Sequence, residues 1–169
     1  ARFDSALPGR SSAGAEIADR SRMRVGYFTS YYPATSHTFM RREIAALERQ
    51  GVTIVRYALR ADPQGLVDPQ DVIEEKKTKF IFRSGFIEIL RCFTTTIVRR
   101  PFSLGKVLSL ALKLGHRSDR GMLRHLAYII EAIVLATWCE QDQVENVHAH
   151  FGTNPAVVTL LASELARIP

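Results

Sequence analysis

Two histidines separated by one residue stand near the end of a short apolar run, in the segment His148-Ala149-His150-Phe151-Gly152. Residues i and i+2 of a β-strand lie on the same face, so both imidazoles can point the same way. Such a pair suits metal ligation, hydrogen bonding to sugar hydroxyls or proton transfer, or a structural role in which each ring bonds to the backbone. No HExxH, CxxC or DxD motif accompanies the pair. The spacing alone leaves these three roles open.

A second group of hydroxyl and aromatic side chains lies in the segment SYYPATSHTF, residues 30–39. A helix is predicted to begin in this segment, with Ser36 as its N-cap. The free N–H groups and the dipole of a helix N-terminus favour an anion or a sugar hydroxyl. The alternative is that Ser36 only caps the helix and the tyrosines only pack. The chain contains no GxGxxG, GxxxxGK[ST] or GxSxG motif, so a dinucleotide fingerprint, a P-loop and a nucleophile elbow are not indicated.

The elements that must position these side chains begin with a strand-helix-strand unit. Residues 24–29 and 52–58 are apolar, β-branched runs, and the helix between them, residues 38–50, ends at Gly51. Met40, Ile44 and Leu47 repeat at helical spacing and predict one buried stripe. A short loop and a helix between two strands predict the start of a parallel sheet. Ligands bind such sheets at the carboxyl ends of the strands, where both polar groups stand.

The rest of the chain predicts further strands and helices. Residues 71–75 predict one helical turn, 78–82 and 146–150 predict strands, and helices are predicted from Ser84, from Pro101, over 122–140 and from Pro155. We therefore expect an α/β fold, a Rossmann-like doubly wound parallel sheet with a helical excursion before its last strand. The three helices of the excursion carry apolar stripes that predict burial: Phe86, Ile89, Leu90, Phe93 and Ile97; Leu104, Val107, Leu108, Ala111 and Leu112; Leu123, Leu126, Ala127, Ile130, Ile133, Val134 and Trp138.

Composition and charge narrow the class of protein. The chain has 169 residues, enough for one domain with a sizeable core. Cys92 and Cys139 lie in apolar helical stretches and predict buried free thiols, which fits a reducing compartment. The net charge is +6, and most of the excess lies between Lys76 and Arg124, where the sequence favours either a solvated face or an anionic partner. The charge alone leaves open whether such a partner is a membrane surface, a phosphorylated substrate or nucleic acid. For a membrane, the residues expected to face it are Arg91, Arg99, Arg100, Lys106 and Lys113.

Two segments resemble the amino-terminal half of family 4 glycosyltransferases, in particular the branch that makes bacterial exopolysaccharide and colanic-acid-like polymers. The first segment matches the family pattern P-x-x-S-E-T-F followed by REI-x-x-L-E-x-x-G, and the second, VHAHFGTNPAVVTLLASELARIP, is similar to its HAHF and IP segment. The resemblance covers residues 23–169. The matching residues of the first segment are Pro33, Ser36, Thr38, Phe39, Arg42, Glu43, Ile44, Leu47, Glu48 and Gly51.

The resemblance implies one half of a GT-B fold, made of two Rossmann-like domains that face each other across a cleft. It implies metal-independent, retaining transfer from a nucleotide sugar, which the second domain binds, to a lipid-linked or oligosaccharide acceptor at the cytoplasmic face of the inner membrane. The chain itself then needs no cofactor and binds no nucleic acid. Expected acceptor-binding residues are Ser36, Thr38, Glu43, His148 and His150, of which His150 is also the one candidate for a catalytic role; no metal ligand is expected. His37 departs from the family by replacing the glutamate of S-E-T-F.

We expect residues 1–22 to be a disordered lead or an artefact, and residues 23–169 to be an incomplete acceptor domain without its donor domain and without activity of its own. Two other functions compete with this one. A metal-dependent hydrolase using His148 and His150 requires further acidic or histidine ligands at other strand ends. A non-catalytic basic module for membrane or nucleic acid requires exposed aromatic residues among the basic ones.

Overall fold

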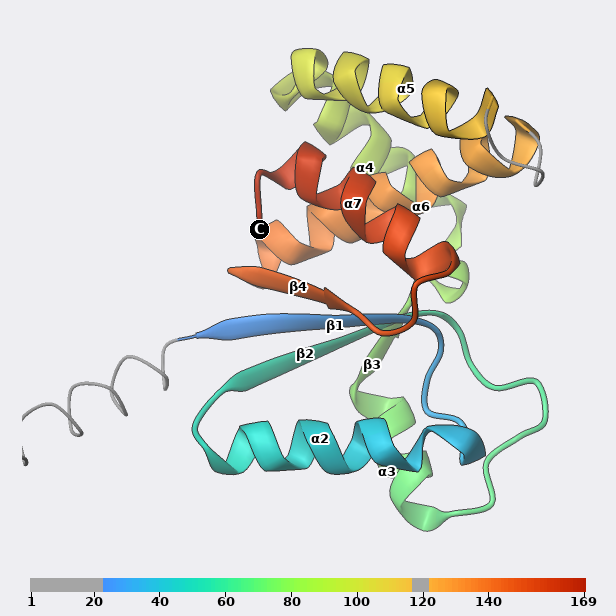
Figure 1. Cartoon of the computed structure of the whole chain (residues 1–169), viewed down its shortest axis with the longest axis vertical. Helices are drawn as coiled ribbons and strands as arrows, with labels where there is room; N and C mark the ends of the chain where they lie inside the picture. Colours follow the sequence, from blue (N-terminus) through green and yellow to red (C-terminus); the bar gives the residue numbers. More distant parts are fainter. Residues whose placement is uncertain (1–22, 117–121) are drawn as a thin grey trace, which may run out of the picture.

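The computed structural model describes residues 23–116 and 122–169, which form a four-stranded, all-parallel sheet flanked by helices (Figure 1). The strands are β1 (Arg24–Tyr31), β2 (Thr53–Arg60), β3 (Thr78–Phe80) and β4 (Asn146–Ala149). Their order across the sheet is β3-β2-β1-β4. This α/β architecture is Rossmann-like, as the sequence predicts. The expected lead, residues 1–22, lies outside the described residues.

Strand β1 is central because it pairs with β2 on one side and β4 on the other. Its register places Gly26 opposite Val55 and Val147, and Tyr27 opposite Arg56 and His148. A Cβ atom at Gly26 would come within 3.0 Å of the Tyr57 ring. Glycine at this position therefore lets the Tyr57 ring lie against the middle strand.

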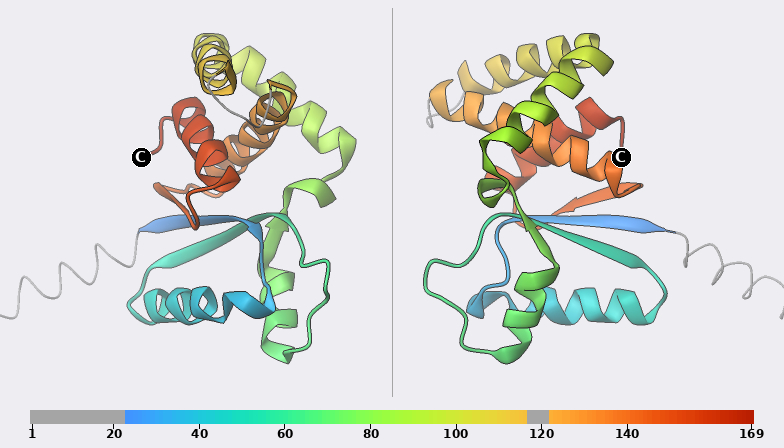
Figure 2. Two further views of the ribbon diagram at one scale, coloured as in Figure 1. Left: turned by 45° about the vertical axis from the view of Figure 1, so that its right-hand side comes forward. Right: turned by 180° about the vertical axis from the view of Figure 1, so that it is seen from behind.

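Helices cover both faces of the sheet, one layer on the first face and a deeper bundle on the second (Figures 1 and 2). The single layer holds α2 (Thr38–Arg49) and α3 (Pro69–Lys77). The bundle is made of α4 (Gly85–Arg99), α5 (Pro101–His116), α6 (Met122–Gln141) and α7 (Asn154–Ala166), with α5 farthest from the sheet. Two short 3-10 turns, η1 (Thr35–His37) and η2 (Ile81–Arg83), precede α2 and α4.

Each face of the sheet has its own apolar core. Under the bundle, Phe28, Tyr57 and Leu59 pack with residues of α6 and α7. Under α2, Tyr27 and Ile54 pack with Met40 and Ile44, members of the predicted stripe of that helix. Both cysteines are buried and unpaired, which confirms their prediction.

The starts of three helices differ from the sequence analysis. The prediction that Ser36 caps α2 is wrong: Ser36 lies inside η1, and His37 occupies the cap position without a side-chain cap bond. Ser84 stands at the cap of α4, but its hydroxyl donates to the Ile81 carbonyl 2.7 Å away. Helix α3 is longer than the single predicted turn because Asp68 accepts from the Gln70 N–H and Pro69 occupies the first turn.

Apolar side chains of the helical bundle are more exposed than their spacing predicts. On α4 the buried positions are Cys92 and Thr96; of the predicted stripe, Ile89 is half-buried against the core and the other members face outward. Its residue Phe86 is 77 % exposed. Parts of the stripes on α5 and α6 are also exposed, because no other element of residues 23–116 and 122–169 covers that side of the bundle. The exposed members of the three predicted stripes are Phe86, Leu90, Phe93, Ile97, Leu108, Leu112, Leu123, Leu126, Ala127 and Ile130.

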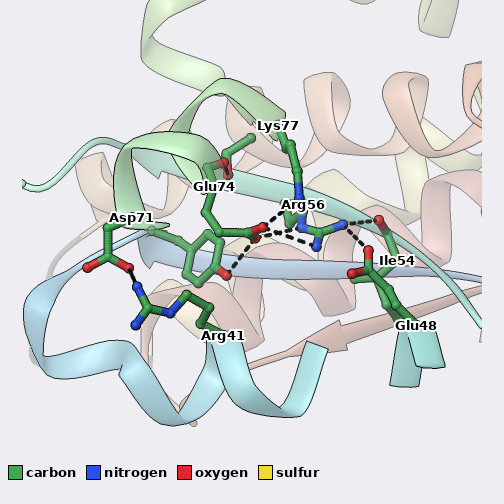
Figure 3. Close-up of polar contacts among 9 residues, drawn as sticks. Arg41, Glu48, Ile54, Arg56, Asp71, Glu74 and Lys77 are labelled. Atoms are coloured by element: carbon green, nitrogen blue, oxygen red, sulfur yellow. Dashed lines mark hydrogen bonds and ion pairs between the residues drawn. The ribbon is translucent and has the colours of Figure 1, made fainter. Parts of the chain in front are cut away.

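A buried arginine ties the single helical layer to the sheet (Figure 3). Arg56, on β2, is 6 % exposed. Its guanidinium donates to Glu74 on α3 at 2.9 Å and to Glu48 on α2 at 2.6 Å. Glu74 also accepts from the hydroxyl of Tyr32, in the loop after β1, at 3.0 Å. One buried cation therefore connects β2, both helices and, through Glu74, the loop that leads into α2.

We expect Arg56→Ala to destabilise the protein by about 3–5 kcal/mol, because it leaves the buried Glu74 carboxylate without its main partner. Lys77→Ala is the matched control, since Lys77 also contacts Glu74, at 3.0 Å, but its side chain is 51 % exposed. The Lys77 change should cost no more than about 1 kcal/mol. Urea unfolding followed by circular dichroism measures both, and equal losses would contradict the role given to Arg56.

Candidate functional site

The two histidines of the sequence pair meet beside Tyr27 at one edge of the sheet. His148 pairs in register with Tyr27, and their ring centroids are 4.9 Å apart. His150 follows β4, and its backbone N–H donates to the Phe28 carbonyl at 3.1 Å. The His148 Nε2 and His150 Nδ1 atoms are 3.3 Å apart. Both imidazoles therefore lie on the α2 face of the sheet, as alternation along a strand predicts.

Glu43 of α2 brings a carboxylate to the same place. The Tyr27 hydroxyl donates to Glu43 Oε1 at 2.8 Å. The pKa of Tyr27 is raised mainly by burial and further by the hydrogen bond to Glu43. Its hydroxyl therefore stays protonated and acts as a donor. Partial burial lowers the pKa of His150; the Glu43 charge opposes this shift, and His148 and His37 add to it. His150 is therefore a neutral ring at neutral pH, able both to donate and to accept.

Three further rings continue this surface. The His37 and Phe151 centroids are 5.2 Å apart, as are those of Phe39 and His150. His37 Nδ1 lies 3.0 Å from the Tyr31 carbonyl; because a carbonyl only accepts, Nδ1 carries a proton and donates it to this carbonyl. Phe151 has φ of 77°, a region that a bulky residue occupies only at a cost of about 1–2 kcal/mol. The strained turn holds its ring against His37 and His150.

The other two predicted residues lie apart from the histidine pair. Ser36 lines a pocket of about 240 Å³ together with Tyr31, His37 and Asp62. Thr38 is exposed in the first turn of α2. The structure thus brings together Glu43, His148 and His150. Ser36 lies in a separate, neighbouring pocket, and His37 lines that pocket and also contacts Phe151 next to His150.

We define the ring cluster as Tyr27, His37, Phe39, Glu43, His148, His150 and Phe151. It lies at the carboxyl end of β4, beside the middle of β1, which carries Tyr27, and against the first half of α2, which carries Glu43.

Comparison with family models, with curated proteins and with solved structures finds no match to this chain.

The chemistry of the ring cluster suits a ligand with many hydroxyl groups. The Glu43 carboxylate and the neutral His150 ring accept hydrogen bonds from hydroxyls, while imidazole N–H groups donate to them. Aromatic rings that are partly exposed, such as Phe39 at 47 % and Phe151 at 44 %, offer flat apolar surface beside these groups. Within residues 23–116 and 122–169 no group of three or more histidine, cysteine, aspartate or glutamate side chains could hold a metal ion.

Sequence reasoning missed Tyr27, Phe39 and Phe151 as members of the site, and gave His37 only as a departure from a family pattern. Tyr27 could have been found, because parallel pairing of the first and last predicted strands brings an inward residue of one next to His148. Phe151 could not, because its position depends on an unusual backbone angle.

The basic residues that were expected to face a membrane lie on two helices of the bundle and the junction between them. Arg91 pairs with Glu88 of the same helix, at 2.7 Å. Arg100 pairs with Glu140 at 2.8 Å and also donates to the Leu165 carbonyl. Arg99, Lys106 and Lys113 are exposed. Of the helices that the structure describes, none has the length and apolar character needed to cross a membrane.

Glu131, in the middle of α6, is an ionisable residue to which the sequence analysis gave no role. It is 6 % exposed, and its Oε2 atom has no hydrogen-bond partner among the described residues. Burial raises the pKa of Glu131 to about 7, opposed only by the more distant charge of Arg60. Near neutral pH the folded protein therefore holds a proton that the unfolded chain releases.

This pKa predicts how stability changes with pH. The contribution of Glu131 is most favourable below its unfolded pKa and is lost as the pH rises from there to about 7. Glu131→Gln should therefore stabilise the protein at about pH 8 by up to about 3 kcal/mol and change little at about pH 4. Urea titrations at both pH values measure this difference. Glu164→Gln, an exposed change on α7, is the control, and an equal effect of Glu131→Gln at the two pH values would refute the assignment.

Proposed function

We propose that this chain is the acceptor-binding part of a retaining glycosyltransferase, and that the ring cluster binds the sugar units of a lipid-linked or oligosaccharide acceptor. The observation that supports the proposal is the meeting of Glu43, His148 and His150 around Tyr27, at the carboxyl end of β4. Doubly wound proteins bind ligands at the carboxyl ends of their strands.

The roles of the residues follow from their chemistry. Glu43 accepts from a sugar hydroxyl with the carboxylate oxygen that Tyr27 does not use. His148 and His150 donate or accept at the rim, and the rings of Phe39 and Phe151 lie against the apolar face of a sugar. The pocket beside Ser36 and Asp62 gives room for a second sugar unit. The donor nucleotide sugar is bound elsewhere, by the domain that the family resemblance implies.

The experiment is saturation-transfer NMR with a citronellyl-pyrophosphate-linked oligosaccharide, a short-chain analogue of a lipid-linked acceptor. We expect sugar protons to receive magnetisation from the wild-type protein. The double change His148→Ala, His150→Ala should weaken binding by about tenfold or more, because it removes two hydrogen-bonding side chains worth about 1 kcal/mol each.

His116→Ala is the matched control, because His116 is exposed at the end of α5, outside the ring cluster. Two results would argue against an acceptor site here. One is the absence of magnetisation transfer to the sugar protons, and the other is an equal loss of transfer in the double histidine variant and in His116→Ala.

A membrane surface is the second part of the proposal, and the exposed face of α4 supports it. Phe86 and Ile87 are 77 % and 84 % exposed, and the same helix carries the exposed side chains of Arg91 and Arg99. Apolar groups flanked by basic ones are typical of surfaces that insert into the headgroup region of anionic lipid. We propose that this face rests on the cytoplasmic side of the membrane that holds the acceptor.

Vesicle flotation tests this part. Wild-type protein should float with phosphatidylglycerol vesicles at low salt and less at high salt. The double change Phe86→Ser, Ile87→Ser should weaken binding by about tenfold or more, from the apolar area that no longer enters the lipid. Val67→Ser is the control, since Val67 is 88 % exposed in the loop between β2 and α3. Binding that is indifferent to anionic lipid and to salt would rule the membrane surface out.

A further inference from the structure

An arginine-lined pocket lies at the junction of α4 and α5, on the second face of the sheet and away from the ring cluster. It has a volume of about 250 Å³ and is lined by Arg99, Arg100, Pro101, Phe102, Ser103 and Arg167. These residues come from the end of α4, the first turn of α5 and the residue after α7. We call it the arginine pocket.

Two of its three arginines have no acidic partner. Arg100 is engaged, because it pairs with Glu140 at 2.8 Å and donates to the Leu165 carbonyl at the end of α7. Arg99 and Arg167 form no ion pair with any carboxylate of the described residues. Two unneutralised guanidinium groups and one partly neutralised group therefore line the same pocket, which leaves it with a strong positive potential.

The first turn of α5 adds donors to the pocket. Pro101 has no N–H, and the first backbone bond of this turn runs from the Leu104 N–H to the Arg100 carbonyl at 3.0 Å. The N–H groups of Phe102 and Ser103 make no backbone bond to the preceding helix within the described residues. The start of a 16-residue helix thus presents free N–H groups toward the pocket.

Ser103 is a second, independent pointer to a ligand. It lines the pocket although it is only 9 % exposed, and its hydroxyl has no hydrogen-bond partner among the described residues. The hydroxyl is therefore available to donate to or accept from a molecule in the pocket. A ligand oxygen in the pocket would supply the missing partner.

We infer that the arginine pocket binds a phosphate group, held by Arg99, Arg100 and Arg167, the Ser103 hydroxyl and the first N–H groups of α5. Guanidinium groups and helix N-termini are the groups that proteins use for phosphate oxygens. The phosphate can belong to a free phosphorylated molecule or to a phospholipid headgroup. The lipid source fits the neighbouring Phe102 and Val98, which are 88 % and 74 % exposed. The inference does not depend on the proposed carbohydrate site.

The first arm of the test is an NMR titration of the full chain with inorganic phosphate, at an ionic strength held constant with chloride. The Ser103 amide and the arginine Nε–H signals should shift and saturate. Arg99→Gln and Arg167→Gln should each weaken this binding by about tenfold, because each removes a charged hydrogen bond. Both arginines are exposed and unpaired, so neither change should disturb folding, which circular dichroism checks.

The second arm uses sedimentation of phosphatidylcholine vesicles with and without phosphatidic acid, whose headgroup is a phosphate monoester. Arg49→Gln, an exposed change at the end of α2, is the control in both arms. Saturable binding of inorganic phosphate that the pocket variants lose and Arg49→Gln keeps supports a free phosphate ligand. Binding only to phosphatidic acid vesicles, with the same dependence on the variants, supports a lipid headgroup.

The inference is overturned if neither probe binds. It is also overturned if Arg49→Gln weakens binding as much as the pocket variants do. Neither arm involves His148 or His150, so this result is independent of acceptor binding at the ring cluster.

Discussion

The buried Arg56 guanidinium constrains how the α2 layer sits on the sheet. A charge inside a protein is tolerated only with partners, since removing it from water costs several kcal/mol. Glu74 and Glu48 provide those partners from two different helices, so neither helix can shift without leaving a charge unpaired. The Tyr32 hydroxyl, bound to the same Glu74, holds the loop after β1. The placement of α2 and of the loop before it thus depends on one cation in the second strand.

The candidate site inherits its geometry from this arrangement. Glu43 reaches Tyr27 because α2 lies along the first face of the sheet, and His37 and Phe39 reach the turn after β4 because the loop is held. Strand β4, through its register with β1, places His148 and the following His150 beside Tyr27. The ring cluster results where β4 ends beside β1 and α2. The arginine pocket is built differently, from the ends of three helices on the other face of the sheet.

Much of the fold could be predicted from particular residues. The β-branched runs, the Met40 and Ile44 spacing and Gly51, with φ of 91°, are local signals, and local signals are set by backbone sterics and periodicity. Glu43 and the His148–His150 pair were also predicted, the histidines because alternation on a strand is a property of any strand. The prediction that Ser36 caps α2 was wrong. A serine can cap a helix only if it lies just outside the first turn, and here a 3-10 turn includes it.

The sequence by itself therefore determined the parallel α/β class and the shared face of the two histidines, because these follow from short-range patterns. Only the tertiary structure decided which apolar stripes are covered. The stripe of α4 has the spacing of a buried one, yet most of it faces outward, because burial depends on whether another element packs there. Tertiary structure also decided what surrounds each charge. Arg56 lies among carboxylates, one oxygen of Glu131 has no hydrogen-bond partner among the described residues, and Arg99 and Arg167 line one pocket. Such pairings join residues far apart in the chain, and no local pattern records them.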